Sequence, residues 1–298
     1  MPLRTLKEET ADSLVLQWVL HVQNYKLALD KNRCVGCQIC SLACPKEAIT
    51  LQEQPRIKGQ KARKAKVDVD LSKCNFCGIC DITCPYGAIK ISMNDKHALP
   101  VVEKESFPEL IRDIRADESK ADPECSKVQD PCPLGLINIT SDAASGKVKV
   151  KVDKEHCPCC TVCEVKLPGM MHVRKMLNGK INIRTEKCPD GCKDCLDVCP
   201  ITGALYISES DEKVRPNESF CVYCGACKVV CPVDEALEFK RTHINHTPIH
   251  SGAWNKTLER LTSPVEMTKE LKTKGSAKAR ESVRKRVGLK VDQICPRK

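Results

Sequence analysis

The chain has 298 residues, 23 cysteines, 3% aromatic residues and a formal net charge of +10. An odd number of cysteines in tight runs argues against a secreted disulfide scaffold, and no stretch approaches the ~20 apolar residues that span a bilayer. So few aromatic residues favour several small modules over one large core, in a reducing cytoplasm where thiols persist.

The first predicted segment, residues 1–26, is an N-terminal extension. It lacks the pattern of a secretory signal, because charged residues precede only a short apolar stretch. These charged residues are Lys7, Glu8, Glu9 and Asp12.

Residues 27–95 form the first predicted module, which contains two cysteine runs. Each run follows a strand-like stretch, LALDKNRC or VDVDLSKC, and precedes another, PKEAITL or PYGAIKI. The basic insert between the runs, QEQPRIKGQKARKAKV, is interpreted as a solvated loop or, alternatively, as a docking patch for an acidic partner. The runs are Cys34, Cys37, Cys40 and Cys44 before Pro45, and Cys74, Cys77, Cys80 and Cys84 before Pro85.

Residues 96–178 form a second predicted module that repeats the pattern incompletely. Its linker, SFPELIRDIRAD at residues 106–117, predicts a short amphipathic helix. Near its end, Asn178-Gly179 between two β-like runs predicts a type I′ hairpin. The two runs are Ala121, Cys125, Val128 and Cys132 before Pro133, and Cys157, Cys160, Cys163 and Leu167 before Pro168.

Residues 179–240 form the third predicted module, and residues 241–298 a basic C-terminal extension. In the extension, a capping box at Ser263 predicts a helix toward Gly275, and a second helical stretch ends at Gly288. The runs of the third module are Cys188, Cys192, Cys195 and Cys199 before Pro200, and Cys221, Cys224, Cys227 and Cys231 before Pro232.

Three cysteines at intervals of three residues, followed by a Cys-Pro pair, have the spacing that binds cubane [4Fe–4S] clusters in bacterial ferredoxins. Zinc sites use two separated ligand pairs, covalent haem requires Cys-x-x-Cys-His, and a thioredoxin-type Cys-x-x-Cys stands alone. The runs match none of these alternatives. We therefore predict iron–sulfur clusters whose binding energy is also folding energy, so that the metal-free chain folds poorly.

The ligands of each cluster follow from a crossover rule. In two-cluster ferredoxins, three cysteines of one run and the fourth of the other bind the same cluster. Applied to six runs in three pairs, the rule predicts five clusters. The ligand sets are Cys34, Cys37, Cys40 and Cys84; Cys74, Cys77, Cys80 and Cys44; Cys157, Cys160, Cys163 and Cys132; Cys188, Cys192, Cys195 and Cys231; and Cys221, Cys224, Cys227 and Cys199.

A sixth site would use Ala121, Cys125, Val128 and Leu167, and it retains one thiol. Because all three losses fall on one site, we infer that this cluster was lost as a unit and its space filled by apolar side chains. The surviving middle cluster would then carry the connection between the outer modules.

Three cysteines remain outside the predicted sets: Cys125, Cys159 and Cys295. We interpret each as an unligated thiol, with the alternative that Cys159 displaces a neighbour as ligand. Each oxidised cluster with four thiolates contributes a charge of about −2, so five sites offset nearly all of the net charge of +10. The positive net charge of the chain therefore mostly balances the negative charge of the clusters. It is weak support for nucleic-acid binding.

The paired runs resemble bacterial-type 2[4Fe–4S] ferredoxins over roughly residues 27–239, and their chaining resembles archaeal polyferredoxins. The segments VVEKESFPELIRDIRADESK and SGAWNKTLERLTSP are similar to the F subunit of formylmethanofuran dehydrogenase. The resemblance implies an α+β fold of tandem ferredoxin-like modules with a mainly helical C-terminal tail. It also implies a non-catalytic electron conduit of methanogenesis, bound to catalytic oxidoreductase subunits and to a ferredoxin-like donor or acceptor.

Two other functions stay open. The chain could be a freestanding carrier or serve a hydrogenase or heterodisulfide reductase. It could also, as a different class, be a nucleic-acid-binding Fe–S protein that uses the basic insert and tail. Basic helices without interleaved aromatic residues argue against the second function.

Overall fold

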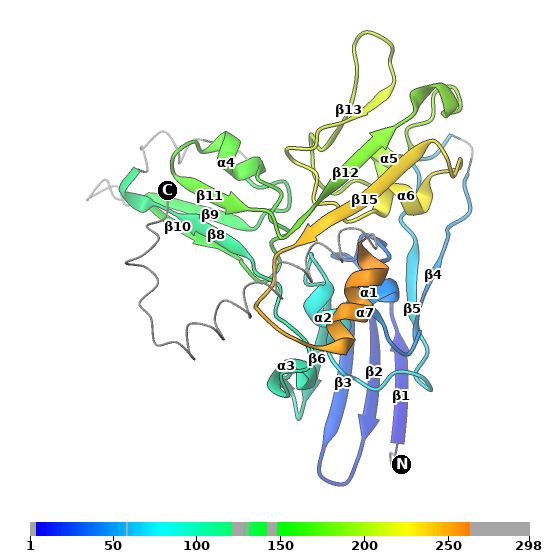
Figure 1. The fold of residues 1–298 in the computed structure, drawn as a ribbon, viewed down its shortest axis with the longest axis vertical. Coiled ribbons are helices and arrows are strands. Elements are labelled where there is room, and N and C mark those ends of the chain that lie inside the picture. Colours follow the sequence, from blue (N-terminus) through cyan, green and yellow to red (C-terminus); the bar gives the residue numbers. More distant parts are fainter. Residues whose placement is uncertain (1–3, 58, 121–127, 129–130, 142–147, 263–298) are drawn as a thin grey trace, which may run out of the picture.

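The computed structural model describes residues 4–57, 59–120, 128, 131–141 and 148–262, and three small α+β units with few helices make up most of it (Figure 1). In each unit, short strands flank the cysteine turns and each run that is fully described leads into a helix of one turn. No helix among the described residues is long and apolar enough to cross a membrane.

The first unit contains two strand pairs around its cysteine runs. Strand β3 (Asn24–Asp30) leads into the first run and pairs with β6 (Ile89–Met93), which leaves the second. Strand β4 (Ile49–Gln52) leaves the first run and pairs with β5 (Lys66–Val69), which leads into the second. The helices α1 (Ile39–Ala43) and α2 (Ile79–Thr83) lie within the runs.

The N-terminal extension is part of the first unit rather than a separate arm. Strands β1 (Arg4–Glu9) and β2 (Ser13–Val19) form a hairpin that joins β3, β6 and β7 (Lys96–His97) in one antiparallel sheet. Leu14 and Leu16 alternate along β2 and are buried, which fixes the register of the hairpin. The sequence analysis assigned no strand to this segment.

The second unit has the same plan although its sequence pattern is incomplete. Strand β8 (Asp113–Ala116) pairs with β11 (Met171–Arg174), and β9 (Ile137–Ser141) pairs with β10 (Val148–Val152). Short helices α3 (Pro100–Glu103), η1 (Glu118–Lys120) and α4 (Val162–Lys166) complete it. Missing cysteines have therefore not changed the order of strand pairing.

The amphipathic helix predicted for residues 106–117 is wrong. Pro108 interrupts the segment, and residues 113–116 form β8 instead, with Ile114 opposite Val173. Burial of Ile114 between the strands outweighs the local helical pattern, because tertiary packing overrides propensity in short segments.

The third unit repeats the plan once more. Strand β12 (Leu177–Ile183) pairs with β15 (Leu237–Ile244), and β13 (Leu205–Ile207) pairs with β14 (Val214–Pro216). Its helices are η3 (Thr185–Lys187), α5 (Asp194–Asp197) and α6 (Ala226–Val230). The common pairing supports the interpretation of the chain as six repeats in three pairs.

The hairpin predicted at Asn178-Gly179 is also wrong. Both residues lie inside β12, where the register with β15 shifts. A Cβ on Gly179 would lie 2.3 Å from the carbonyl oxygen of Lys240, so a close backbone approach, and not a turn, requires glycine here.

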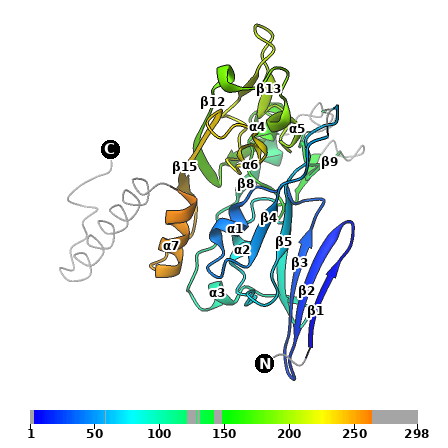
Figure 2. The same cartoon turned by 90° about the vertical axis from the view of Figure 1, so that its right-hand side faces the viewer.

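Helix α7 (Gly252–Leu261) returns from the third unit and packs on α1 of the first (Figures 1 and 2). Trp254 is fully buried edge-on against Phe107, and Arg260 donates a 3.2 Å hydrogen bond to the carbonyl oxygen of Cys44. The helices predicted from Ser263 to Gly275 and up to Gly288 lie outside the described residues.

The basic insert of the first unit is anchored to the third unit. Arg56 pairs with Asp194 at 2.6 Å, and the amide of Ala62 donates to the carboxylate of Asp197 at 2.9 Å. The insert therefore connects the first unit to helix α5 of the third.

Candidate iron–sulfur sites

The cysteine turns share one backbone conformation. After the first and second cysteines of four runs, one residue has a positive φ, which turns the chain back so that the next thiol faces the same side. These pairs are Gly36 and Gln38, Phe76 and Gly78, Cys159 and Thr161, and Tyr223 and Gly225. The run of the degenerate unit thus has the same turn as the intact runs.

Backbone amides point at the sulfur atoms in these turns. Ala48 donates to Cys44 Sγ at 3.4 Å, Ala88 to Cys84 Sγ at 3.3 Å, and Tyr223 to Cys221 Sγ at 3.4 Å. Such N–H···S bonds stabilise a charged thiolate and tune the potential of a bound cluster. The turns are therefore built to hold ionised sulfur.

In the first unit, thiols of the two cysteine runs lie near one another. Burial raises the pKa of Cys34, and the charge of Cys84 raises it further. Burial likewise raises the pKa of Cys74 and of Cys77, and the charge of Cys44 raises both further. Each group thus takes one thiol from the opposite run.

The second unit brings together one complete group. Burial raises the pKa of Cys160 to about 11 and of Cys163 to about 12, and the charges of Cys157 and Cys132 contribute to both. Cys132, which lies in the other run, is therefore close to the three thiols of the second run.

Two of the four positions of the predicted sixth site, which has lost three of its cysteines, lie in the described part of the chain. Leu167 occupies the place of a fourth cysteine and is fully buried in the same apolar cluster as Met170, Met171 and Met176. Val128 is half-buried against that cluster, whereas Ala121 and Cys125 lie outside the described residues. Large apolar side chains therefore fill the interior next to this position.

The third unit has two groups. Burial raises the pKa of Cys195 to about 12, with contributions from Cys192, Cys231 and Cys188, and these four thiols line a cavity of about 280 Å³. Burial likewise raises the pKa of Cys199 to about 12, with contributions from Cys224 and Cys221. Cys227 is next to the same three thiols.

The donor sets fit [4Fe–4S] clusters. The 21 cysteines in the described part of the chain are all free of disulfides, and soft thiolates in groups of four suit iron–sulfur chemistry. No group of three His, Cys, Asp or Glu side chains there could hold a single metal ion.

Cys159 differs from the thiols in these groups. It stands at the positive-φ position that Gly36, Phe76 and Tyr223 occupy in other runs, and it is fully buried. A hydrogen bond to Cys157, together with burial, raises its pKa far above the usual range. The turn thus uses the backbone of Cys159, and burial disfavours ionisation of its thiol.

Two cations that join the units carry no signal in the sequence. Arg112 donates to the carbonyl oxygens of Cys84 and Cys157 at 2.7 Å each, and so links the first unit to the second. Lys175 donates to the carbonyl oxygen of Cys221 at 3.0 Å and interacts with the charge of Cys160, and so links the second unit to the third. A single basic residue in a linker forms no sequence motif, so these contacts can be recognised only in the structure.

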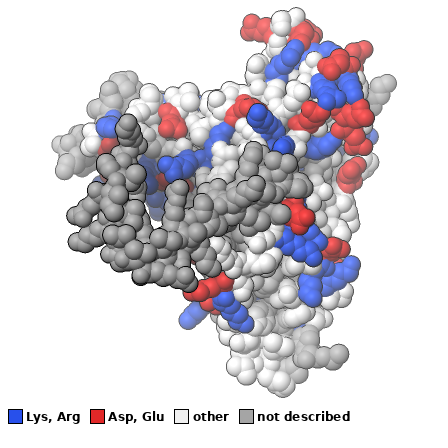
Figure 3. Space-filling view, in the orientation of Figure 1, with Lys and Arg blue, Asp and Glu red and all other residues white. Residues whose placement is uncertain are grey.

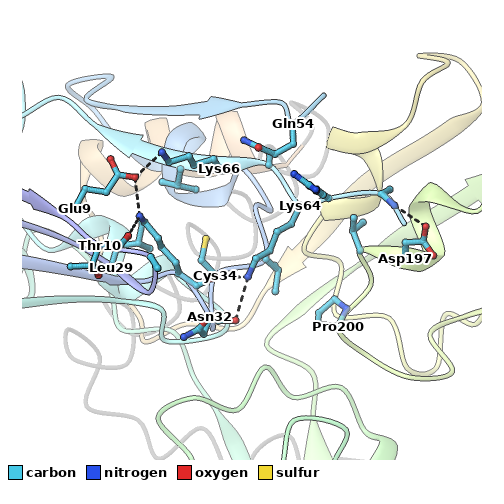
Figure 4. A pocket seen from close by; sticks show the side chains of 18 residues that line it. Glu9, Thr10, Leu29, Asn32, Cys34, Gln54, Lys64, Lys66, Asp197 and Pro200 are labelled. Atoms are coloured by element: carbon cyan, nitrogen blue, oxygen red, sulfur yellow. Dashed lines mark hydrogen bonds and ion pairs between the residues drawn. The ribbon is translucent and has the colours of Figure 1, made fainter. Parts of the chain in front are cut away.

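A cavity of about 830 Å³ opens over Cys34, between the first and third units (Figure 4). Its wall contains Lys31 and Lys66, which share the carboxylate of Glu9 at 2.8 and 2.7 Å, and Lys64, which donates to the carbonyl oxygen of Lys31. Cations therefore outnumber carboxylates in the wall of the cavity at Cys34.

Comparison with known proteins supports the iron–sulfur assignment. Residues 33–88 and 186–235 match the 4Fe-4S dicluster domain. Formate hydrogenlyase subunit 2 of Escherichia coli is 35% identical over 104 residues, which are 30% of this chain and 47% of that protein. The polyferredoxin-like subunit of aliphatic sulfonate oxidoreductase from Pyrococcus furiosus is 30% identical over 104 residues, 31% of this chain and 58% of that protein. The chain spans about half the length of these curated relatives.

One solved structure is similar over most of the fold. A chain of the formate dehydrogenase–heterodisulfide reductase–formylmethanofuran dehydrogenase complex of Methanospirillum hungatei superposes with a TM-score of 0.75 at 27% identity. The match covers 88% of this chain and 92% of that one. The ferredoxin-like dicluster modules are therefore arranged as in a subunit of a multi-enzyme complex.

Proposed function

We propose that the chain is a non-catalytic electron-transfer subunit that holds five [4Fe–4S] clusters in three modules, at residues 27–95, 96–178 and 179–240. The observation that carries this proposal is the left-handed turn that four of the cysteine runs share, together with the proximity of thiols from paired runs. When bound, each cluster takes up and releases single electrons. Iron and sulfide analysis of the anaerobically purified chain tests the number: about 20 iron atoms support it, and about 24 overturn it.

The residues of the chain have three tasks in this proposal. The thiols bind the clusters, the amides of the turns stabilise the charged sulfur, and the apolar core excludes water around it. The first and third units each hold two groups of thiols. Cys80 contributes to the raised pKa of Cys40 in the first unit, as Cys195 does for Cys227 in the third. Neighbouring sites within a module are therefore close enough to exchange electrons.

More specifically, the chain is the F-type subunit of an archaeal formylmethanofuran dehydrogenase and works in the cytoplasm of a methanogen. The similarity to a chain of the Methanospirillum hungatei complex and the two linker segments named above support it. Affinity purification of the tagged chain from its native cell tests the assignment. Co-purification of formylmethanofuran dehydrogenase subunits supports it, and isolation with a hydrogenase or heterodisulfide reductase alone overturns it.

A soluble acidic electron carrier of the ferredoxin type would dock at the cavity over Cys34. Surplus positive charge from Lys31, Lys64 and Lys66 favours an acidic surface there, and Cys34, a proposed cluster ligand, lines the cavity. Steering by charge makes the rate of reduction sensitive to salt. A rate that is independent of ionic strength would exclude this docking mode.

Nucleic-acid binding is the less favoured function. On the visible face, lysine and arginine side chains are interspersed with aspartate and glutamate (Figure 3). Nucleic acids bind to surfaces on which basic residues are clustered. A salt-dependent shift of DNA or RNA at low ionic strength would reopen this alternative.

A further inference from the structure

The first and third modules meet directly, without the middle module between their thiols. Cys37 of the first module and Cys224 of the third both pack against the same two buried apolar clusters. These residues belong to different modules and are 187 positions apart in the sequence. The two candidate sites therefore approach each other at this pair.

A buried cation lies at the same junction. Arg241 is 5% exposed, and among the described residues it pairs with no carboxylate. Its guanidinium donates to the carbonyl oxygens of Tyr223 at 2.9 Å and Cys224 at 2.6 Å. The negative groups that act on it are the thiols Cys37, Cys224, Cys227 and Cys221. A buried charge needs a counter-charge, and here the thiolates of two sites supply it.

A buried hydroxyl completes the junction from the other side. Tyr86 of the first module is 4% exposed and lines the small cavity around Cys199, Cys221 and Cys224. Its hydroxyl has no well-aligned hydrogen-bond partner in the described part of the chain, and Cys224 lines the same cavity. A hydroxyl hydrogen rotates freely, so a charged thiolate at Cys224 would orient it as a donor.

We propose that Tyr86 and Arg241 form a direct electron-transfer junction between the first and third modules, and that the middle module is a side branch. Tyr86 donates to the thiolate of Cys224, and Arg241 balances the charge on Cys37 and Cys224 together. This inference rests on the proposed cluster-binding function. It replaces the expectation that the middle cluster carries the connection between the outer modules.

The middle module fits the role of a branch. Arg112 and Lys175 connect its one group of thiols to both neighbours. Two positions of its predicted second site hold apolar residues, the fully buried Leu167 and the half-buried Val128. Electrons that enter this module therefore have no second site to reach within it, whereas the outer modules each retain two.

The hydrogen bond is tested with Tyr86→Phe, which removes the hydroxyl and keeps the buried ring. The full-length, cluster-loaded chain is titrated electrochemically and followed by EPR. Hydrogen bonds to sulfur stabilise the reduced, more negative state of a cluster, so their loss should move one redox step to lower potential. At a fixed potential, the ratio of reduced to oxidised cluster should fall about threefold or more. Tyr206→Phe, at a residue 48% exposed on β13, is the matched control. An unchanged titration of Tyr86→Phe overturns the junction.

The route is tested with a Cys157→Ser, Cys160→Ser double variant, which removes the middle cluster. After substoichiometric reduction, rapid-freeze EPR measures how fast electrons redistribute between the modules. We expect a rate within about twofold of the wild type and about four fewer iron atoms per chain. A tenfold or greater slowing shows that the middle cluster is the link and overturns the proposal. Wild-type protein without iron–sulfur clusters would instead reject the proposed function itself.

Discussion

Arg112 donates a hydrogen bond of 2.7 Å to the carbonyl oxygen of Cys157. The same guanidinium binds the carbonyl oxygens of Cys84 and Pro85 at 2.7 and 2.8 Å, so one side chain satisfies three carbonyl oxygens from two modules. Arginine suits this task because its donors are fixed in a planar fork. The contact holds the second module in place beside a predicted ligand of the first.

Replacing Arg112 with glutamine should loosen the contact between the first two modules. Hydrogen bonds from charged groups contribute about 1.5–3 kcal/mol, and their loss leaves buried carbonyl oxygens unsatisfied. Hydrogen–deuterium exchange around Cys157 should rise at least tenfold in the cluster-loaded chain, equivalent to about 1.4 kcal/mol. Arg115→Gln, which removes an exposed ion pair with Asp113, should leave exchange there unchanged. Equal exchange in both variants would contradict the role of Arg112.

Leu167→Ala should destabilise the chain because it opens a cavity where a cluster ligand would otherwise stand. Leu167 is fully buried, and large-to-small substitutions at such sites cost about 2–5 kcal/mol. Anaerobic denaturant unfolding measures the loss. Val165→Ala in the preceding helix α4 is the matched control, because Val165 is 64% exposed and its truncation should change the free energy of unfolding little. A loss as small as that of the control would show that the interior near Leu167 is not packed.

Removing the clusters should unfold the modules. The aromatic content is 3%, and the raised pKa values of buried thiols such as Cys160 and Cys199 show that the groups resist ionisation without metal. Cluster binding therefore supplies much of the folding free energy. After chelation and oxidation, far-UV circular dichroism should lose most of its strand signal, and restored iron and sulfide should recover it. A metal-free chain with an unchanged spectrum would contradict this coupling.

The sequence was sufficient to predict the repeats, because the spacing of the cysteine runs is a strong local pattern. The strands that lead into the runs at Cys34, Cys74 and Cys157 were all recognisable as short apolar alternations. The association of Cys132 with the second run of its module followed from the crossover rule, although the first run is incomplete. The ligand sets themselves stay a prediction.

Features that depend on contacts between residues far apart in the sequence were missed. The segment at residues 106–117 forms a strand because Ile114 meets Val173 across β8 and β11, a pairing of residues far apart in the sequence. Asn178-Gly179 lies in a strand because β12 pairs with β15, which follows some sixty residues later. Tyr86 and Arg241 carry no motif, and their role is visible only where two modules meet. Local patterns predicted each module, but not how the modules pack together.

Cys159→Ser should leave the middle cluster intact. Cys159 occupies the positive-φ position of its turn, and its thiol is held protonated by burial and by the hydrogen bond to Cys157. Iron analysis should give about 20 atoms per chain for Cys159→Ser and about four fewer for Cys160→Ser. The reverse result, with iron lost only from Cys159→Ser, would make Cys159 the ligand in place of its neighbour.

Lys64→Glu should slow electron exchange with an acidic ferredoxin-type carrier. The side chain lies in the wall of the cavity over Cys34, and its charge lowers the pKa of that thiol against the effect of burial (Figure 4). Reversing one charge beside a docking surface reduces the association rate most at low salt, so we expect a drop of about tenfold at low ionic strength that shrinks as salt is added. Stopped-flow reduction measures the rate. Lys149→Glu, on the exposed face of β10, is the charge-matched control and should leave the rate unchanged. If both variants slow the reaction equally, net charge and not docking over Cys34 governs the encounter.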